Sequence, residues 1–85
     1  MKKIELQQVG EVLERLYDSE IEVEISSIWN DGFEFKLGHF GKEKKSNGGS
    51  KLPTFLAAVN AIAFQACVNY PDSVFAIWYA DLPNT

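Results

Sequence analysis

The stretch from Glu20 to Leu37 alternates apolar and polar residues in two runs, which the tripeptide Asn30-Asp31-Gly32 separates. Alternation with a period of two is typical of β-strands that bury one face and leave the other in water. An Asn-Asp-Gly segment between two such runs is typical of a hairpin turn. This feature constrains the fold most, because the apolar face of an antiparallel hairpin must be covered by other elements.

The length of the hairpin loop decides which residues lie opposite one another. A two-residue turn at Asp31-Gly32 would place the apolar residues of the two strands on opposite faces. A three-residue loop places nearly all of them on one face, which burial favours. We therefore predict a three-residue loop, Asn30-Asp31-Gly32, with a bulge at Gly32. The predicted pairs are Trp29 with Phe33, Ser27 with Phe35, and Ile25 with Leu37.

Two segments with helical spacing flank the hairpin. Apolar residues recur every three or four positions from about residue 4 to residue 18, which predicts an amphipathic helix. Gly10 lies on its apolar stripe. Either the helix begins near Gly10, or the alanine-rich second helix packs closely there; we favour the second explanation. The second helix is predicted over residues 55–69, with Thr54 as its N-cap.

The second helix carries two apolar stripes on nearly opposite sides, which predicts burial on both sides. The turn YPDS, residues 70–73, follows it. Residues 74–79 form either a strand or a short helix capped by Asp72 or Ser73, and their spacing does not decide between the two. Residues 39–51 form a polar loop, or their first half forms an edge strand. The two stripes are Phe55, Val59, Ile62, Ala63 and Ala66, and Ala57, Ala61, Phe64 and Val68.

These elements predict a single α+β domain over residues 1–85. We expect two layers, in which an antiparallel sheet of two or three strands packs under two helices. The hairpin occupies residues 20–38 and the helices about 4–18 and 55–69. The order is α-β-β-(β)-α, followed by a short C-terminal element.

The chain is acidic, with a net charge of -4, which argues against a dedicated nucleic-acid-binding protein. Residues 5–24 contain seven carboxylates and one arginine, Arg15. Residues 52–85 contain no lysine or arginine and only two aspartates. Because surfaces normally need charge, this last third is either deeply buried or covered by a partner.

Few residues offer chemistry. Cys67 is the only cysteine, which excludes an intrachain disulfide and fits a reducing cytoplasm. His39 is the only histidine, and the carboxylates Glu22 and Glu24 lie on a solvated strand face, so no metal site, cofactor or catalytic pair is expected. The start of the chain has no uninterrupted apolar stretch like that of a signal peptide, and the most apolar segment is shorter than a membrane span of about 20 residues. We therefore expect neither export nor membrane insertion.

The sequence therefore predicts a small soluble protein that acts by association, as a homodimer or as an accessory subunit of another protein. The excess of apolar residues between 52 and 80 motivates this expectation. The expected partner surface consists of Ala57, Ala61, Phe64, Val68, Phe75, Trp78 and Tyr79.

The stretch GKEKKSNGGSKLPTFLAAVNAIAF resembles the end of double-stranded RNA-binding domains, where a glycine-rich loop and lysines lead into an alanine-rich helix. The order of a helix, three strands and a helix is also similar. This resemblance implies RNA binding as an alternative function, through Lys42, Lys44, Lys45 and Lys51. The chain departs from that family because Lys51 stands alone before the last helix and the first helix is acidic.

The phrases SEIEVEISSIWNDGFEFKLG and YPDS resemble a family of short bacterial proteins that has no assigned function. The shared features are a helix, a W-x-x-G-F hairpin, a final helix and the closing turn. This resemblance implies a fold and no activity.

Overall fold

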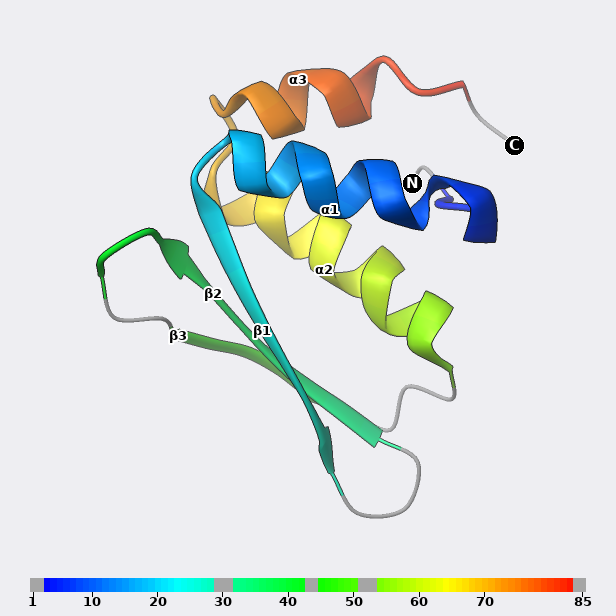
Figure 1. The fold of residues 1–85 in the computed structure, drawn as a ribbon, viewed down its shortest axis with the longest axis vertical. Helices are drawn as coiled ribbons and strands as arrows, with labels where there is room; N and C mark the ends of the chain where they lie inside the picture. Colours follow the sequence, from blue (N-terminus) through cyan, green and yellow to red (C-terminus); the bar gives the residue numbers. More distant parts are fainter. Residues whose placement is uncertain (1–2, 29–31, 43–44, 51–53, 84–85) are drawn as a thin grey trace.

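The computed structural model describes residues 3–28, 32–42, 45–50 and 54–83. Among these residues, three α-helices, one 3-10 helix and a three-stranded sheet confirm the α+β class (Figure 1). No helix among the described residues is both long and apolar enough to cross a membrane. In chain order the elements are the 3-10 helix η1 (Leu6–Gln8), α1 (Val9–Asp18), β1 (Ile21–Ile28), β2 (Gly32–His39), β3 (Lys45–Ser50), α2 (Phe55–Asn69) and α3 (Val74–Ala80).

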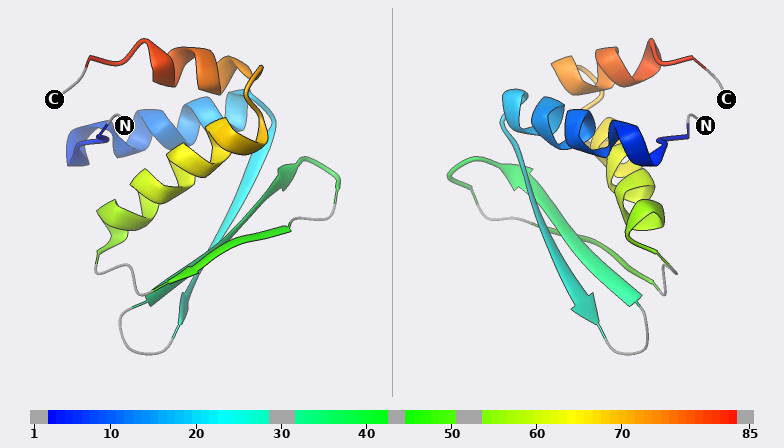
Figure 2. Two further views of the ribbon diagram at one scale, coloured as in Figure 1. Left: turned by 180° about the vertical axis from the view of Figure 1, so that it is seen from behind. Right: turned by 45° about the vertical axis from the view of Figure 1, so that its right-hand side comes forward.

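The helices gather on one side of the twisted sheet (Figures 1 and 2). Both α1 and α2 contact the sheet, α1 through β1 and α2 through β2. The third helix packs on α1 and α2 and lies at the far side of the helical layer from the sheet (Figure 2). The prediction of two helices over one sheet is therefore confirmed, and α3 adds to the helical layer.

The hairpin buries the face that the alternation predicts, but in a different register. Ile25 lies opposite Phe35 and Val23 lies opposite Leu37, so the predicted pair Ile25–Leu37 is wrong. A shift of two residues returns every side chain to the same face of a strand. Burial therefore selected the correct face but could not distinguish these two registers.

The same shift moves the loop. Gly32 belongs to β2 and lies opposite Ile28, so it is not a loop residue as predicted. Ser27 lies opposite Phe33, which contradicts the predicted pairs Ser27–Phe35 and Trp29–Phe33. The segment 29–31 lies outside the described residues. The irregularity in the sheet lies between Phe35 and Lys36, where β2 pairs with β3.

The third strand begins later in the chain than the edge strand that the sequence offers as an alternative for residues 39–45. It runs from Lys45 to Ser50 and pairs with residues 33–37 of β2. Gly48 and Gly49 lie opposite Phe35 and Glu34. Such residues have low strand propensity, so it is the hydrogen-bonding edge of β2 that makes this segment a strand.

The core lies between the sheet and the helices. The stripe of α2 that faces the core is fully buried at Val59, Ile62, Ala63 and Ala66, as predicted for one of its two apolar sides, whereas Phe55 at its start is 45% exposed. Thr54 is the N-cap of α2, because its Oγ1 accepts a hydrogen bond from the Ala57 amide at 3.0 Å. The largest fully buried side chains are Phe75, Ile4, Leu16, Ile21, Leu37, Ile62, Val12 and Val59.

Gly10 does not mark a close helix contact. It is exposed near the start of α1, and a Cβ added there would meet nothing within 4 Å. The helix begins at Val9, after the 3-10 helix. The prediction that the second helix packs closely at Gly10 is therefore wrong. The alternative explanation, that the first helix starts near Gly10, is correct.

Candidate protein-binding surfaces

The outer stripe of α2 faces solvent in the single chain. Phe64 is 46% exposed and Val68 is 56% exposed, while Ala57 and Ala61 on the same stripe are half-buried. No charged residue occurs anywhere in α2. This side of α2 is therefore apolar and uncovered within one chain.

Residues 74–80 form a helix, which decides which of their side chains reach the surface. Ser73 caps α3 by accepting the Ala76 amide at 3.0 Å. Phe75 and Tyr79, one turn apart, face the core, so their prediction as partner-surface residues is wrong. The exposed positions of α3 are instead Val74, at 64%, and Ile77, at 60%.

Trp78 is half-buried and is partly covered by Arg15 of α1. The guanidinium carbon lies 5.4 Å from the centroid of the indole ring, within the range of a cation–π contact. Arg15 also pairs with Glu11 at 3.4 Å. One side of α1 thus contacts α3, and Trp78 contributes less to the open surface than predicted.

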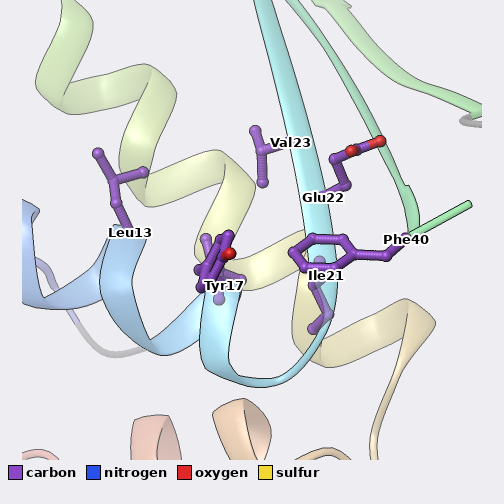
Figure 3. Close-up of a pocket in the computed structure, with 7 residues that line it drawn as sticks. Leu13, Tyr17, Ile21, Glu22, Val23 and Phe40 are labelled. Carbon is purple, nitrogen blue, oxygen red and sulfur yellow. The ribbon is translucent and has the colours of Figure 1, made fainter.

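The other side of α1 forms an apolar groove with β1 (Figure 3). Its volume is about 480 Å³. The ring of Tyr17 meets the ring of Phe40 edge to face, at 5.1 Å between centroids. Figure 3 shows Leu13 on α1 and Val23 on β1 beside the space between the two elements. The lining residues are Leu13, Leu16, Tyr17, Ile21, Glu22, Val23 and Phe40.

The sequence patterns do not reveal this groove. Leu13 and Tyr17 share the helical spacing of residues 4–18, and Phe40 lies in the segment 39–51, which the sequence predicts as a polar loop or, in its first half, an edge strand. In the structure Tyr17 is 67% exposed, because the centre of the buried stripe passes through Val12 and Leu16. The only sign of the groove in the sequence is that the apolar stripe of the first helix is too wide to be buried completely.

His39 lies in a second cavity, of about 500 Å³, near the turn between α2 and α3. Its ring lies edge to face against that of Tyr70, at 4.4 Å between centroids. The cavity is also lined by Asp18, Glu20 and Asp72. Within residues 3–28, 32–42, 45–50 and 54–83, no cluster of His, Cys, Asp and Glu could hold a metal ion.

Cys67 is a half-buried thiol on α2 that packs against the core. Burial raises the pKa of this thiol above its ordinary value. Burial also raises the pKa of Tyr79, and the charge of Cys67 raises it further. A raised thiol pKa lowers the thiolate fraction at neutral pH, which makes Cys67 a poor nucleophile.

The lysines predicted for RNA are only partly described. Lys42 is exposed in the turn after β2, and Lys45 is the first residue of β3. Lys44 and Lys51 lie outside the described residues. The helix α1 carries Glu11, Glu14 and Asp18 on its exposed side.

The fold and these surfaces define a small α+β protein with two apolar regions open to solvent, the outer sides of α2 and α3 and the groove between α1 and β1. No family model matches the chain, and no curated protein and no solved structure matches it.

Proposed function

We propose that the protein acts by association with another protein chain, in the first place a second copy of itself, through the outer sides of α2 and α3. The observation that carries this proposal is the combination of exposed apolar side chains with a complete lack of charge on both helices. We call this region the α2–α3 surface and define it by Phe64, Val68, Val74 and Ile77.

The electrostatics support self-association at this surface. Two copies that meet through α2 would bring no like charges together, because the helix has none. The carboxylates of α1 and of the outer sheet face lie on other elements. Burial of aromatic and branched side chains then supplies the favourable free energy, at about 25 cal/mol for each Å² removed from water.

Size-exclusion chromatography with light scattering tests this proposal. At micromolar concentration the chain should have twice the mass of one copy. The variant Phe64→Glu should be a monomer, because it places a charge at the centre of the surface. The matched control is Leu6→Glu, which changes an exposed apolar residue of η1 that lies elsewhere. A monomeric wild-type chain would contradict self-association, and equal dissociation of both variants would contradict its assignment to the α2–α3 surface.

RNA binding is the second candidate, and one observation favours it. The order α1–β1–β2–β3–α2 has the three consecutive strands between two helices that the resemblance to double-stranded RNA-binding domains implies. A gel-shift assay with double-stranded RNA at low salt tests it. Binding that weakens steeply with salt and with Lys44→Glu and Lys45→Glu would support this candidate. RNA binding that neither added salt nor these two substitutions weaken would refute this candidate.

A further inference from the structure

The strand β1 is an edge of the sheet. The strand order is β1-β2-β3, so β1 pairs with β2 alone among the described strands. An edge strand presents unpaired backbone N–H and C=O groups that can accept another strand. Common protections of such an edge are charged side chains, especially lysine, and proline. The strand β1, with the sequence IEVEISSI, contains two glutamates but no lysine or proline.

The register shows which backbone groups point away from β2. The Phe40 amide donates to the Glu20 carbonyl at 3.2 Å, so residues 20 and 40 form a hydrogen-bonded pair at the start of the ladder. Such pairs alternate along an antiparallel ladder, so Glu22 and Glu24 also bond to β2. The backbone groups of Val23 and Ile25 therefore point toward the open edge.

The apolar groove lies beside the same edge. It is lined by α1, β1 and Phe40, and no residue of β2 contributes to it. In Figure 3 the space with Leu13 and Val23 lies on one side of β1, and β2 lies on the other. A strand added to β1 would thus direct every second side chain toward Leu13, Tyr17 and Val23.

The charges beside the groove are negative. Glu22 lines it, and Glu24 follows on the same outer face of β1, where it forms a half-exposed ion pair with Lys36 of β2 at 4.0 Å. On α1, the exposed residues Glu14 and Asp18 directly follow the groove residues Leu13 and Tyr17. The described lining contains no lysine or arginine. The remaining side chains of an added strand would meet carboxylates.

We propose that the groove between α1 and β1 binds an extended segment of a partner protein by strand addition to β1. The segment alternates apolar residues, which enter the groove, with lysine or arginine, which face Glu22 and Glu24. This site differs from the α2–α3 surface and does not depend on the self-association proposed there. Backbone hydrogen bonds provide affinity, and the alternating side chains provide specificity.

A second copy of β1 is the wrong occupant for this site. Antiparallel pairing of two β1 strands would bring Glu22 and Glu24 of one copy beside the same residues of the other. Like charges on neighbouring strands are destabilising. The acidic edge thus disfavours self-pairing and favours a basic partner strand.

The probe is an acetylated and amidated peptide of alternating valine and lysine, titrated against the isotope-labelled protein and followed by NMR. In the free protein the amides of Val23 and Ile25 should exchange with solvent much faster than those of Glu22 and Glu24. Bound peptide should slow exchange at Val23 and Ile25. The control peptide has the same composition, with its valines and lysines in two separate blocks, and should bind at least about tenfold more weakly.

Two variants locate the peptide. Val23→Pro removes an N–H that points to the open edge, where proline is tolerated, and should weaken binding about tenfold. Glu24→Lys leaves the backbone intact, lies on the exposed face and replaces the ion pair with Lys36 by two neighbouring lysines. It should weaken the valine–lysine peptide and strengthen a valine–glutamate peptide. This variant keeps the test decisive if Val23→Pro does not fold.

Several outcomes would overturn the proposal. These are no saturable binding of the alternating peptide, equal binding of the block peptide, and unchanged exchange at Val23 and Ile25 in the bound state. Protection of Val23 and Ile25 by the protein's own dimerisation would identify a β1–β1 interface instead. The dimer formed through α2 and α3 would leave both amides exchanging fast, so failure here is distinguishable from failure of the proposed self-association.

Discussion

The side chain of Asn60 on α2 binds both backbone groups of Ile4, a residue 56 positions earlier in the chain. Its Oδ1 accepts the Ile4 amide at 2.7 Å, and its Nδ2 donates to the Ile4 carbonyl at 3.0 Å. The same Nδ2 lies 3.0 Å from the Leu56 carbonyl. Ile4 is fully buried. Asn60 thus fixes the segment before α1 against α2 and satisfies backbone groups that have no helix or strand to bond with.

Replacement of Asn60 by leucine should lower the free energy of unfolding by about 2–3 kcal/mol, because it leaves the Ile4 amide and carbonyl without these partners. Urea denaturation followed by circular dichroism measures the change. The matched control is Gln65→Ala, which removes the exposed hydrogen bond of Gln65 to Asn69. It should change stability by no more than about 0.5 kcal/mol. Equal losses in the two variants would contradict the role of Asn60.

Phe75 should contribute far more to stability than Ile77, although both are large apolar residues of α3. Phe75 is fully buried and contacts the rings of Trp78 and Tyr79. Phe75→Ala should cost about 3–5 kcal/mol. Ile77→Ala, measured at low concentration where the chain is a single copy, should cost no more than about 0.5 kcal/mol. A larger loss at Ile77 than at Phe75 would refute this orientation of α3.

Gly10→Ala should stabilise the protein by about 0.5 kcal/mol, because alanine favours the helix and nothing lies within 4 Å of the new Cβ. Gly41→Ala should have the opposite effect. Gly41 has a φ of 78°, a conformation that alanine adopts at a cost of about 1–2 kcal/mol. Thermal denaturation of both variants measures the difference. A destabilising Gly10→Ala would restore the close helix contact that the structure contradicts.

Thr54→Ala should lower the stability by about 1 kcal/mol through the loss of the N-cap of α2. Thr54→Ser retains the hydroxyl that accepts the Ala57 amide and should keep most of the stability. Urea denaturation compares the two variants with the wild type. Equal losses for serine and alanine would show that the methyl group of Thr54, and not its hydroxyl, supports the helix.

Stability should fall as the pH rises above about 9. The folded chain holds the protons of Cys67 and Tyr79 more tightly than the unfolded chain, whose ordinary pKa values are 9.0 and 10.0. Above those values the unfolded state releases protons first, so the free energy of unfolding decreases with pH. In Cys67→Ala the decrease should begin at higher pH. An unchanged pH profile in this variant would exclude a contribution from Cys67.

The hairpin shows what an alternating pattern of apolar and polar residues predicts and what it does not. The alternation of Ile21, Val23 and Ile25 with glutamates correctly predicted a strand and its buried face. It did not predict that Ile25 lies opposite Phe35, because a two-residue slide preserves the pattern of faces. Only the pairing of complete strands, with Ile28 opposite Gly32, selects the register.

The candidate binding surfaces were predictable in part. The second apolar stripe of α2 was visible from helical spacing, and Phe64 and Val68 are exposed as expected of a partner surface. Phe75 was assigned to the wrong side, because the segment was not known to be a helix. The groove was missed, since it depends on the position of Phe40 beside Tyr17, residues that lie on different elements.

The sequence alone determined the elements whose signals are local. These elements are the hairpin with one apolar face and the helix over residues 55–69 with its Thr54 cap. The sequence also determined that the last two helices carry no charge. Tertiary structure decided the strand register, the recruitment of the glycine-rich segment 45–50 to the edge of β2, and the orientation of α3. The physical reason is that these features depend on backbone pairing and burial between segments distant in sequence, which periodicity within one segment does not contain.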